Sequence, residues 1–185
     1  MAYTFIKTVI LNESPNKTEL QLVKLPYARG DLDPCISEDT INYHYGKLAK
    51  GYVDRYNNDE GDSDFNQAGA FLHNLLFPQY QSPIRNNTPT GPVFDFINEH
   101  YANFDEFKST VEDVAMKVQG SGWVYLAKNG QIKTIKNHQL KSDIILLIDW
   151  WEHSYFVDYG PDKHEYLKNQ WKIINWDFIN TRIKL

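Results

Sequence analysis

The chain has 185 residues, a formal net charge of −5 at pH 7, and an aromatic content of 15%, which is enough to build a dense core. This length fits one domain or two small subdomains that share a core, and the lack of a basic cluster argues against a nucleic-acid-binding surface. The single cysteine, Cys35, excludes an intramolecular disulfide and any site that needs several cysteines. No run approaches the roughly 20 apolar residues that span a bilayer, and the N-terminus does not resemble a signal peptide. We therefore expect a cytoplasmic protein with no membrane or nucleic-acid partner.

Residues 1–24 alternate loosely between apolar and polar, and we expect an N-terminal arm there without assigned chemistry. A helix is predicted from Ser37, a good N-cap followed by acidic residues. Apolar and aromatic residues then recur at helical spacing, and His44 lies within this stripe. Taken alone, a histidine on an apolar helix face is more often a satisfied core residue than a ligand.

A polar turn at 57–63 leads into a second predicted helix, from Phe65 to about Phe77, with Ser63 or Asp64 as its cap and Pro78 as its stop. A turn this short makes the two helices antiparallel, so we expect a helical hairpin over residues 25–85. His73 on the second helix falls at about the same depth as His44 on the first. Two histidines that face each other across a hairpin favour a binding site over coincidence.

Residues 86–185 predict a second, α/β part with a small antiparallel sheet, so the fold class is α+β. We expect helices from Pro92 to about Tyr101 and from Asn103 to Met116, and one or two closing helices over 161–185. The strands are predicted within 119–127, at 131–136 and at 144–148. The first two are joined by a two-residue turn at Asn129-Gly130.

The third predicted strand is continuously apolar and ends at Asp149, with His153 four residues later. A carboxylate at the end of a buried strand is costly unless a cation or several donors satisfy it. By themselves, Asp149 and His153 fit a metal pair or a structural hydrogen-bonded pair equally well; the two upstream histidines favour the metal. Three imidazoles and one carboxylate suit manganese, iron or zinc. Because no spare buried carboxylate is evident, redox chemistry is favoured over hydrolysis.

Several segments resemble the iron/manganese superoxide dismutase family from Leu25 onward. The motifs that carry the resemblance, as they stand here, are Leu25-Pro-Tyr-Ala, Tyr43-His-Tyr-Gly-Lys47 with Tyr52, Phe65-Asn-Gln-Ala-Gly-Ala-Phe-Leu-His73, Gln119-Gly-Ser-Gly-Trp123, Asp149-Trp-Trp-Glu-His153 and Ile174-Asn-Trp-Asp. The resemblance implies a helical hairpin followed by an α/β metal-binding subdomain. It also implies disproportionation of superoxide to O2 and H2O2 by ping-pong redox cycling of one manganese or iron ion.

The resemblance also implies roles for individual residues. The metal ligands would be His44, His73, Asp149 and His153. The surrounding catalytic residues would be Tyr52, Trp123, Trp151 and His138. In the family a glutamine usually hydrogen-bonds the solvent ligand from one of two places, which here are Gly69 and His138. A histidine at the second place often accompanies tolerance of either metal, so we expect manganese or a cambialistic enzyme. The alternative for His138 is an exposed hairpin residue.

Glu152 would bridge the subunits of a homodimer, and Lys47 and Lys163 would guide the anion, although Lys163 also fits an ordinary solvated lysine. Two departures from the family pattern stand at the expected gateway, where Leu48 replaces a histidine and Phe156 a tyrosine. Replacing both partners of a hydrogen bond with apolar groups can be nearly neutral. The alternative function is a catalytically impaired metal-binding or structural protein on the same fold.

Overall fold

The computed structural model describes residues 17–183. Most of the predicted arm, residues 1–16, lies outside the described residues. Residues 17–24 have no regular secondary structure and are held against the helices that follow. The backbone N–H of Leu20 donates to Asn57 Oδ1 and that of Val23 to Asn74 Oδ1, each at 2.8 Å.

The predicted helical hairpin is present, and its first helix has three consecutive segments: α2 (Glu38–Tyr43), a π-helical segment (His44–Ala49) and α3 (Lys50–Asn57). The predicted cap at Ser37 is confirmed, because its hydroxyl accepts from the Thr40 N–H. The second helix is α4 (Ser63–Leu76). Its predicted cap was wrong by one or two residues, since the Asp62 carboxylate accepts the Phe65 N–H at 2.9 Å. This cap closes the short turn that makes the helices antiparallel.

The π-helical segment changes which residues of the first helix enter the core. The Lys50 N–H reaches back five residues to the Tyr45 carbonyl, which inserts one residue relative to an α-helix. In an unbroken α-helix Leu48, four residues after His44, would share its buried face, but Leu48 is only half-buried and Ala49 is fully buried. The wider turn begins at His44, the first of the predicted ligands.

The second part of the chain contains the predicted helices and a three-stranded sheet. Its elements are α5 (Pro92–His100), α6 (Phe104–Ala115), β1 (Gly122–Ala127), β2 (Ile132–Lys136), β3 (Ile144–Asp149), a short 3-10 turn (Glu152–Ser154), α7 (Phe156–Tyr159), α8 (Lys163–Ile173) and α9 (Trp176–Ile183). The sheet is antiparallel with the order β2-β1-β3.

The turn between β1 and β2 differs from the two-residue turn that Asn129-Gly130 predicted. The Ala127 N–H bonds to the Gln131 carbonyl and the Gly130 N–H to the Ala127 carbonyl, so three residues form the loop. Gly130 has a φ of +80°, whereas Asn129 does not have a positive φ. A type I′ turn would need positive φ at both positions. Gly130 is the single residue of this loop with a positive φ, and the loop therefore has three residues, 128–130.

The outer edge of β3 is satisfied by side chains in place of a fourth strand. The Gln79 amide accepts the Leu147 N–H at 3.2 Å and donates to the Leu147 carbonyl. Arg182 donates to the Ile145 carbonyl at 3.0 Å and to Gln79 Oε1 at 3.1 Å. Unpaired backbone groups of a buried strand would otherwise be costly. These contacts fix the strand that ends at Asp149.

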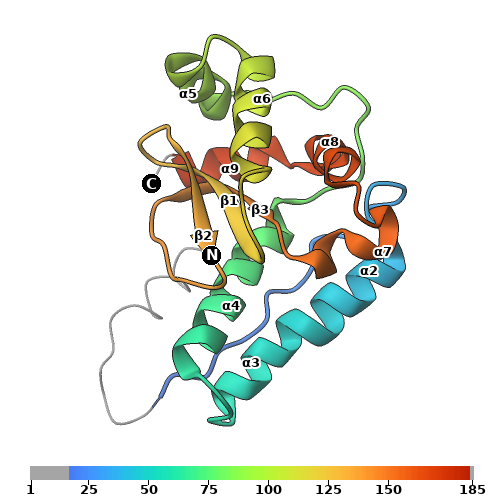
Figure 1. Cartoon of the computed structure of the whole chain (residues 1–185), viewed down its shortest axis with the longest axis vertical. Coiled ribbons are helices and arrows are strands. Elements are labelled where there is room, and N and C mark those ends of the chain that lie inside the picture. Colours follow the sequence, from blue (N-terminus) through green and yellow to red (C-terminus); the bar gives the residue numbers. More distant parts are fainter. Residues whose placement is uncertain (1–16, 184–185) are drawn as a thin grey trace.

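Figure 1 shows the helical hairpin (α2, α3 and α4) on one side of the sheet, with α5 at the far end of the molecule and α6 running from there to β1 and β2. All six residues of β3 are buried, as are all six of β1. The end of β3 therefore points into the region between the sheet and the hairpin. Among the described residues, no helix has the length and apolar character needed to cross a membrane.

Candidate metal centre

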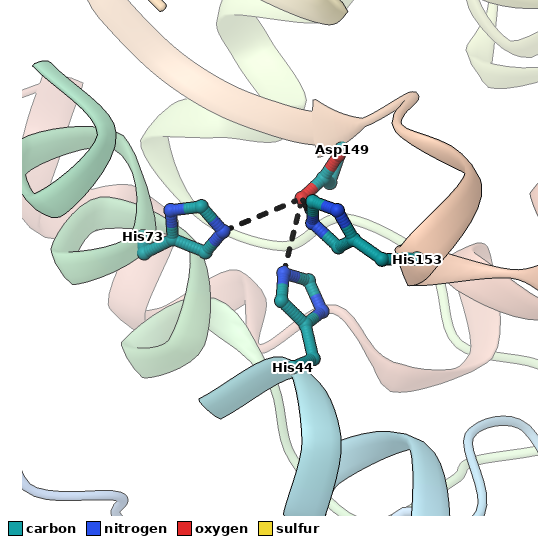
Figure 2. Close-up of side chains that lie close together, drawn as sticks. All are labelled: His44, His73, Asp149 and His153. Carbon is teal, nitrogen blue, oxygen red and sulfur yellow. Dashed lines mark hydrogen bonds and ion pairs between the residues drawn. The ribbon is translucent and has the colours of Figure 1, made fainter. Parts of the chain in front are cut away.

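Four potential metal donors converge where the hairpin meets the end of β3. His44 starts the π-helical segment, His73 lies on α4, Asp149 ends β3 and His153 lies in the following 3-10 turn. One donor atom from each lies within 4.8 Å of the others. Figure 2 shows the imidazole rings gathered around the Asp149 carboxylate from separate segments of the chain. The structure thus brings together all four residues that the sequence predicted as ligands.

The nitrogen atoms of this cluster face one carboxylate oxygen. The Nε2 atoms of His44, His153 and His73 lie 3.1, 3.3 and 3.8 Å from Asp149 Oδ2. Although they are close to the carboxylate, the Nε2 atoms of His44 and His73 are buried and are not aligned for a hydrogen bond to any described group. Buried polar atoms without a partner are rare in proteins. Their convergence on one point is what a bound cation would satisfy.

Hydrogen bonds orient the ligand side chains. His73 Nδ1 lies 2.7 Å from the Gly69 carbonyl, which can only accept. The Nδ1 proton therefore donates to Gly69, and the lone pair of Nε2 is left for a metal. The backbone N–H of Trp151 donates to Asp149 Oδ1 at 2.8 Å. The other carboxylate oxygen, Oδ2, faces the histidines. The Tyr166 hydroxyl donates to the Asp149 carbonyl at 2.9 Å and fixes the end of the strand.

The protonation states of the cluster also suit metal binding. Burial, reinforced by the neighbouring His153, lowers the pKa of His44. Burial, together with His44, holds the pKa of His73 well below its ordinary value. Burial alone would raise the pKa of Asp149, but His153 and His44 outweigh it and hold that pKa well below its usual range. The centre therefore presents His44 and His73 as neutral imidazoles and Asp149 as an ionised carboxylate, the forms that coordinate metals.

The four predicted catalytic residues surround the cluster as a mostly aromatic wall. The Tyr52 ring stacks on His73 with centroids 5.4 Å apart, and Trp123 meets His73 edge-on at 5.0 Å. Trp151 stacks on His138 at 4.6 Å and on His153 at 5.6 Å. Burial and the charge of Asp149 raise the pKa of Tyr52 to about 12, with Arg55 acting in the opposite direction. These rings keep bulk water from the donors.

His138 is buried, so the alternative of an exposed hairpin residue was wrong. Only 6% of its surface is exposed, and the Trp123 indole N–H donates to its Nδ1 at 3.1 Å. Burial lowers the pKa of His138 to about 4. At neutral pH the remaining proton is therefore on Nε2, which is also buried without a partner among the described residues. His138 thus offers an unused hydrogen-bond donor beside the Tyr52 and His73 rings.

Three further residues, Glu152, Lys47 and Lys163, were predicted to act outside the cluster. Glu152 and Lys47 are exposed. Lys47 Nζ lies 6.0 Å from the centre of the Tyr43 ring. Lys163 Nζ lies 5.3 Å from the Tyr155 ring and 5.4 Å from the Trp150 ring. Neither lysine is placed against the rings that contact the ligands.

Two residues near the cluster were missed as contributors by the sequence reasoning. Arg55 places its guanidinium 4.9 Å from the centre of the Tyr52 ring. Its position three residues after Tyr52 on one helix was the available signal. Gly69 had been noted only as an alternative place for a glutamine. A Cβ at Gly69 would lie 2.8 Å from Tyr52 Cγ, so this glycine makes room for the ring.

The fold and the donor set together define a mononuclear metalloprotein of the helical-hairpin plus α/β type, with three nitrogen ligands and one oxygen ligand. Sequence models of both domains of the iron/manganese superoxide dismutases match the chain: the alpha-hairpin domain over residues 19–90 and the C-terminal domain over residues 89–182.

Characterised relatives cover most of the chain. A superoxide dismutase [Mn/Fe] of Porphyromonas gingivalis is 32% identical over 88% of this chain and 98% of its own length. A superoxide dismutase [Fe] of Escherichia coli K12 is 33% identical over 86% and 95%, and one of Plasmodium falciparum is 30% identical over 89% and 96%. The chain belongs to the iron/manganese superoxide dismutase family.

Proposed function

We propose that the chain is a superoxide dismutase that converts superoxide to O2 and H2O2 with one manganese or iron ion. The observation that carries this conclusion is the convergence of three imidazoles and one carboxylate within 4.8 Å, in a chain similar over most of its length to superoxide dismutases. When bound, the ion would supply the one-electron redox couple that accepts an electron from one superoxide and returns it to the next. His44, His73, Asp149 and His153 would hold it.

The protein's own residues would set the charge and the water content of this centre. Imidazoles bind a metal in their neutral form, so Asp149 would be the only charged ligand and would offset part of the charge of a bound cation. Tyr52, Trp123 and Trp151 would limit water and shape the space beside the ligands. Electrostatic interactions are stronger where water is excluded, so a small anion would be attracted to the centre more effectively.

His138 would hold a proton at Nε2 and donate it as a hydrogen bond into the centre. The Trp123 indole N–H occupies Nδ1, and the low pKa of His138 keeps the ring neutral at pH 7. A hydrogen-bond donor beside the ligands tunes the reduction potential of a bound metal. This residue in place of glutamine supports manganese or a cambialistic enzyme, and the P. gingivalis relative carries both metals in its name.

Exposed aromatic and apolar side chains beside the centre support a homodimer. Phe156 and Val157 are 56% and 60% exposed, and Tyr43 is 44% exposed. Exposed apolar side chains on two elements that pack against each other, here α2 and α7, are typical of an interface. Glu152 would bridge to the metal-ligand histidine of the second subunit. Sedimentation of the wild type and of Phe156→Asp tests this: a dimer that the variant weakens is expected, and a monomeric wild type would contradict it. The cytoplasmic location stays a prediction.

The alternative is a catalytically impaired protein on the same fold, and Leu48 and Phe156 at the gateway are the observations that favour it. Dismutation assays on purified protein with measured metal content separate the two. The wild type is expected to hold about one ion per chain and to be active. His73→Ala should lose metal and activity together, whereas the matched control His164→Ala, on the exposed side of α8, should keep both. Full metal content in His73→Ala would show that the ligand set is wrong.

A further inference from the structure

Arg55 on α3 lies over the Tyr52 ring, with the guanidinium carbon 4.9 Å from the ring centre. This is within the range of a cation–π contact. Arg55 Nε donates to Asn66 Oδ1 at 3.0 Å, and the Asn66 amide donates in turn to the Glu60 carbonyl at 2.9 Å. Asn66 is only 3% exposed, so it anchors the arginine firmly. Arg55 itself is exposed and can meet an ion from solvent.

Two glycines make this arrangement possible. A Cβ at Gly51, one turn before Arg55, would lie 3.0 Å from Arg55 Nη1. A Cβ at Gly69 would lie 2.8 Å from Tyr52 Cγ. The first glycine allows the guanidinium to fold back along α3, and the second allows the phenol ring to approach α4. The close stack of guanidinium on phenol therefore depends on the absence of a side chain at both positions.

The stack leads directly to the metal centre. The same Tyr52 ring contacts His73, with centroids 5.4 Å apart, and His138, at 4.8 Å. The Arg55 guanidinium and a metal-ligand imidazole are therefore both neighbours of one aromatic ring. The lysines first expected to guide the anion contact other rings: Lys47 lies by Tyr43 and Lys163 by Trp150 and Tyr155. Arg55 is the better placed cation.

We propose that Arg55 receives the incoming superoxide anion at the Tyr52 side of the metal centre, an inference that rests on the proposed dismutase function. The chain as a whole carries a net charge of −5, which repels anions at long range. A fixed cation beside the Tyr52 ring counteracts this repulsion locally, and focused fields of this kind raise association rates. The site should accept small monovalent inorganic anions in general, because a guanidinium recognises their charge and does not lose its own proton to them.

The test compares three variants of the metal-loaded protein: Arg55→Gln, Arg55→Lys and Lys50→Gln. Lys50 is the matched control, since it lies on the same helix but pairs with Asp54. The first measurement is kcat/KM for superoxide as a function of ionic strength. We expect Arg55→Gln to lower it roughly five-fold at about 10 mM ionic strength and to approach the wild type above about 0.5 M, where the Debye length is short. Lys50→Gln should change it less than about two-fold.

The second measurement is the dissociation constant of azide, a non-reacting anion, followed by the absorption of the loaded protein. It should rise in Arg55→Gln by a factor similar to the loss in kcat/KM, and Arg55→Lys should recover most of both losses. A residue that only supported the fold would lower metal content and would not produce a salt-dependent difference. The lysine variant keeps the test informative if the glutamine variant folds poorly.

The inference is overturned if Arg55→Gln loses no more than Lys50→Gln at low salt, or if azide binds all variants equally. Failure of the proposed function gives a different result, namely a wild type that holds its metal but does not dismutate superoxide. In that case the azide titration still reports on Arg55. If the wild type is active and Arg55→Gln has the same kcat/KM and azide affinity, only the inference about Arg55 fails and the proposed function stands.

Discussion

Replacement of His138 by glutamine should make the metal-free protein more tolerant of acid. His138 has a pKa of about 4 in the folded protein against an ordinary value of 6.5, because it is buried. Between these values the unfolded chain binds a proton that the folded protein does not. Stability contributed by the neutral ring is therefore complete above pH 6.5 and is lost as the pH falls toward 4.

The size of the effect follows from the two pKa values. A difference of this size corresponds to about 3 kcal/mol once the pH is below both values, and to about 2 kcal/mol between pH 8 and pH 5. His138 is only 6% exposed, so solvent screening does not reduce this figure much. In His138→Gln the amide oxygen can still accept the Trp123 indole N–H, and the proton linkage disappears.

Urea unfolding of the metal-free wild type and of His138→Gln at pH 8 and pH 5 measures the difference. Metal is removed because its binding carries its own proton linkage. His44 and His73 are present in both proteins, so their contributions cancel. The wild type should lose about 2 kcal/mol more than the variant over this interval, and His100→Gln, an exposed histidine on α5, should behave as the wild type. Equal losses in wild type and His138→Gln would refute the reasoning.

Three further substitutions test separate parts of the structure. Leu48→His should leave the metal content per chain unchanged, because Leu48 is not among the four donors; a loss of half the metal, measured by elemental analysis, would contradict this. Gly69→Ala should destabilise the protein in urea by about 1–2 kcal/mol, because its Cβ would lie 2.8 Å from the rigid Tyr52 ring, and a stabilised variant would be unexpected. Gly51→Ala should stabilise α3 by about 0.5–1 kcal/mol, since the crowded Arg55 Nη1 is the end of a flexible side chain. In Gly51→Ala the dependence of kcat/KM on ionic strength should also become weaker, because the new methyl group displaces the Arg55 guanidinium. An unchanged salt dependence would contradict the role of Arg55.

Local sequence signals predicted the elements that carry the ligands. Ser37 as a helix cap, the apolar run that ends at Asp149, and the histidines on the two helices of a short hairpin all follow from short-range rules. Those signals were enough to predict that His44, His73, Asp149 and His153 lie close together. They work because each depends on a few neighbouring residues.

The features that the sequence did not predict depend on contacts between distant segments. The π-helical segment moves Ala49 into the core in place of Leu48, and no residue of that helix marks the insertion. Gln79 completes the edge of β3 across 68 residues of sequence. His138 was expected beside the centre from the family resemblance, but its packing against Trp151 and Tyr52 was not predicted. Such contacts override local propensity because packing contributes more free energy than any single residue's preference.

Dismutation of superoxide by protein stripped of metal and reconstituted separately with manganese and with iron tests the central claim most directly. Each preparation is first shown to hold about one ion per chain, and superoxide decay is then followed at matched metal content. The four-ligand centre and the buried donor at His138 predict activity with manganese, with iron or with both. Full metal loading without dismutation by either metal would contradict the proposed function and would identify a metal-binding protein that retains the fold alone.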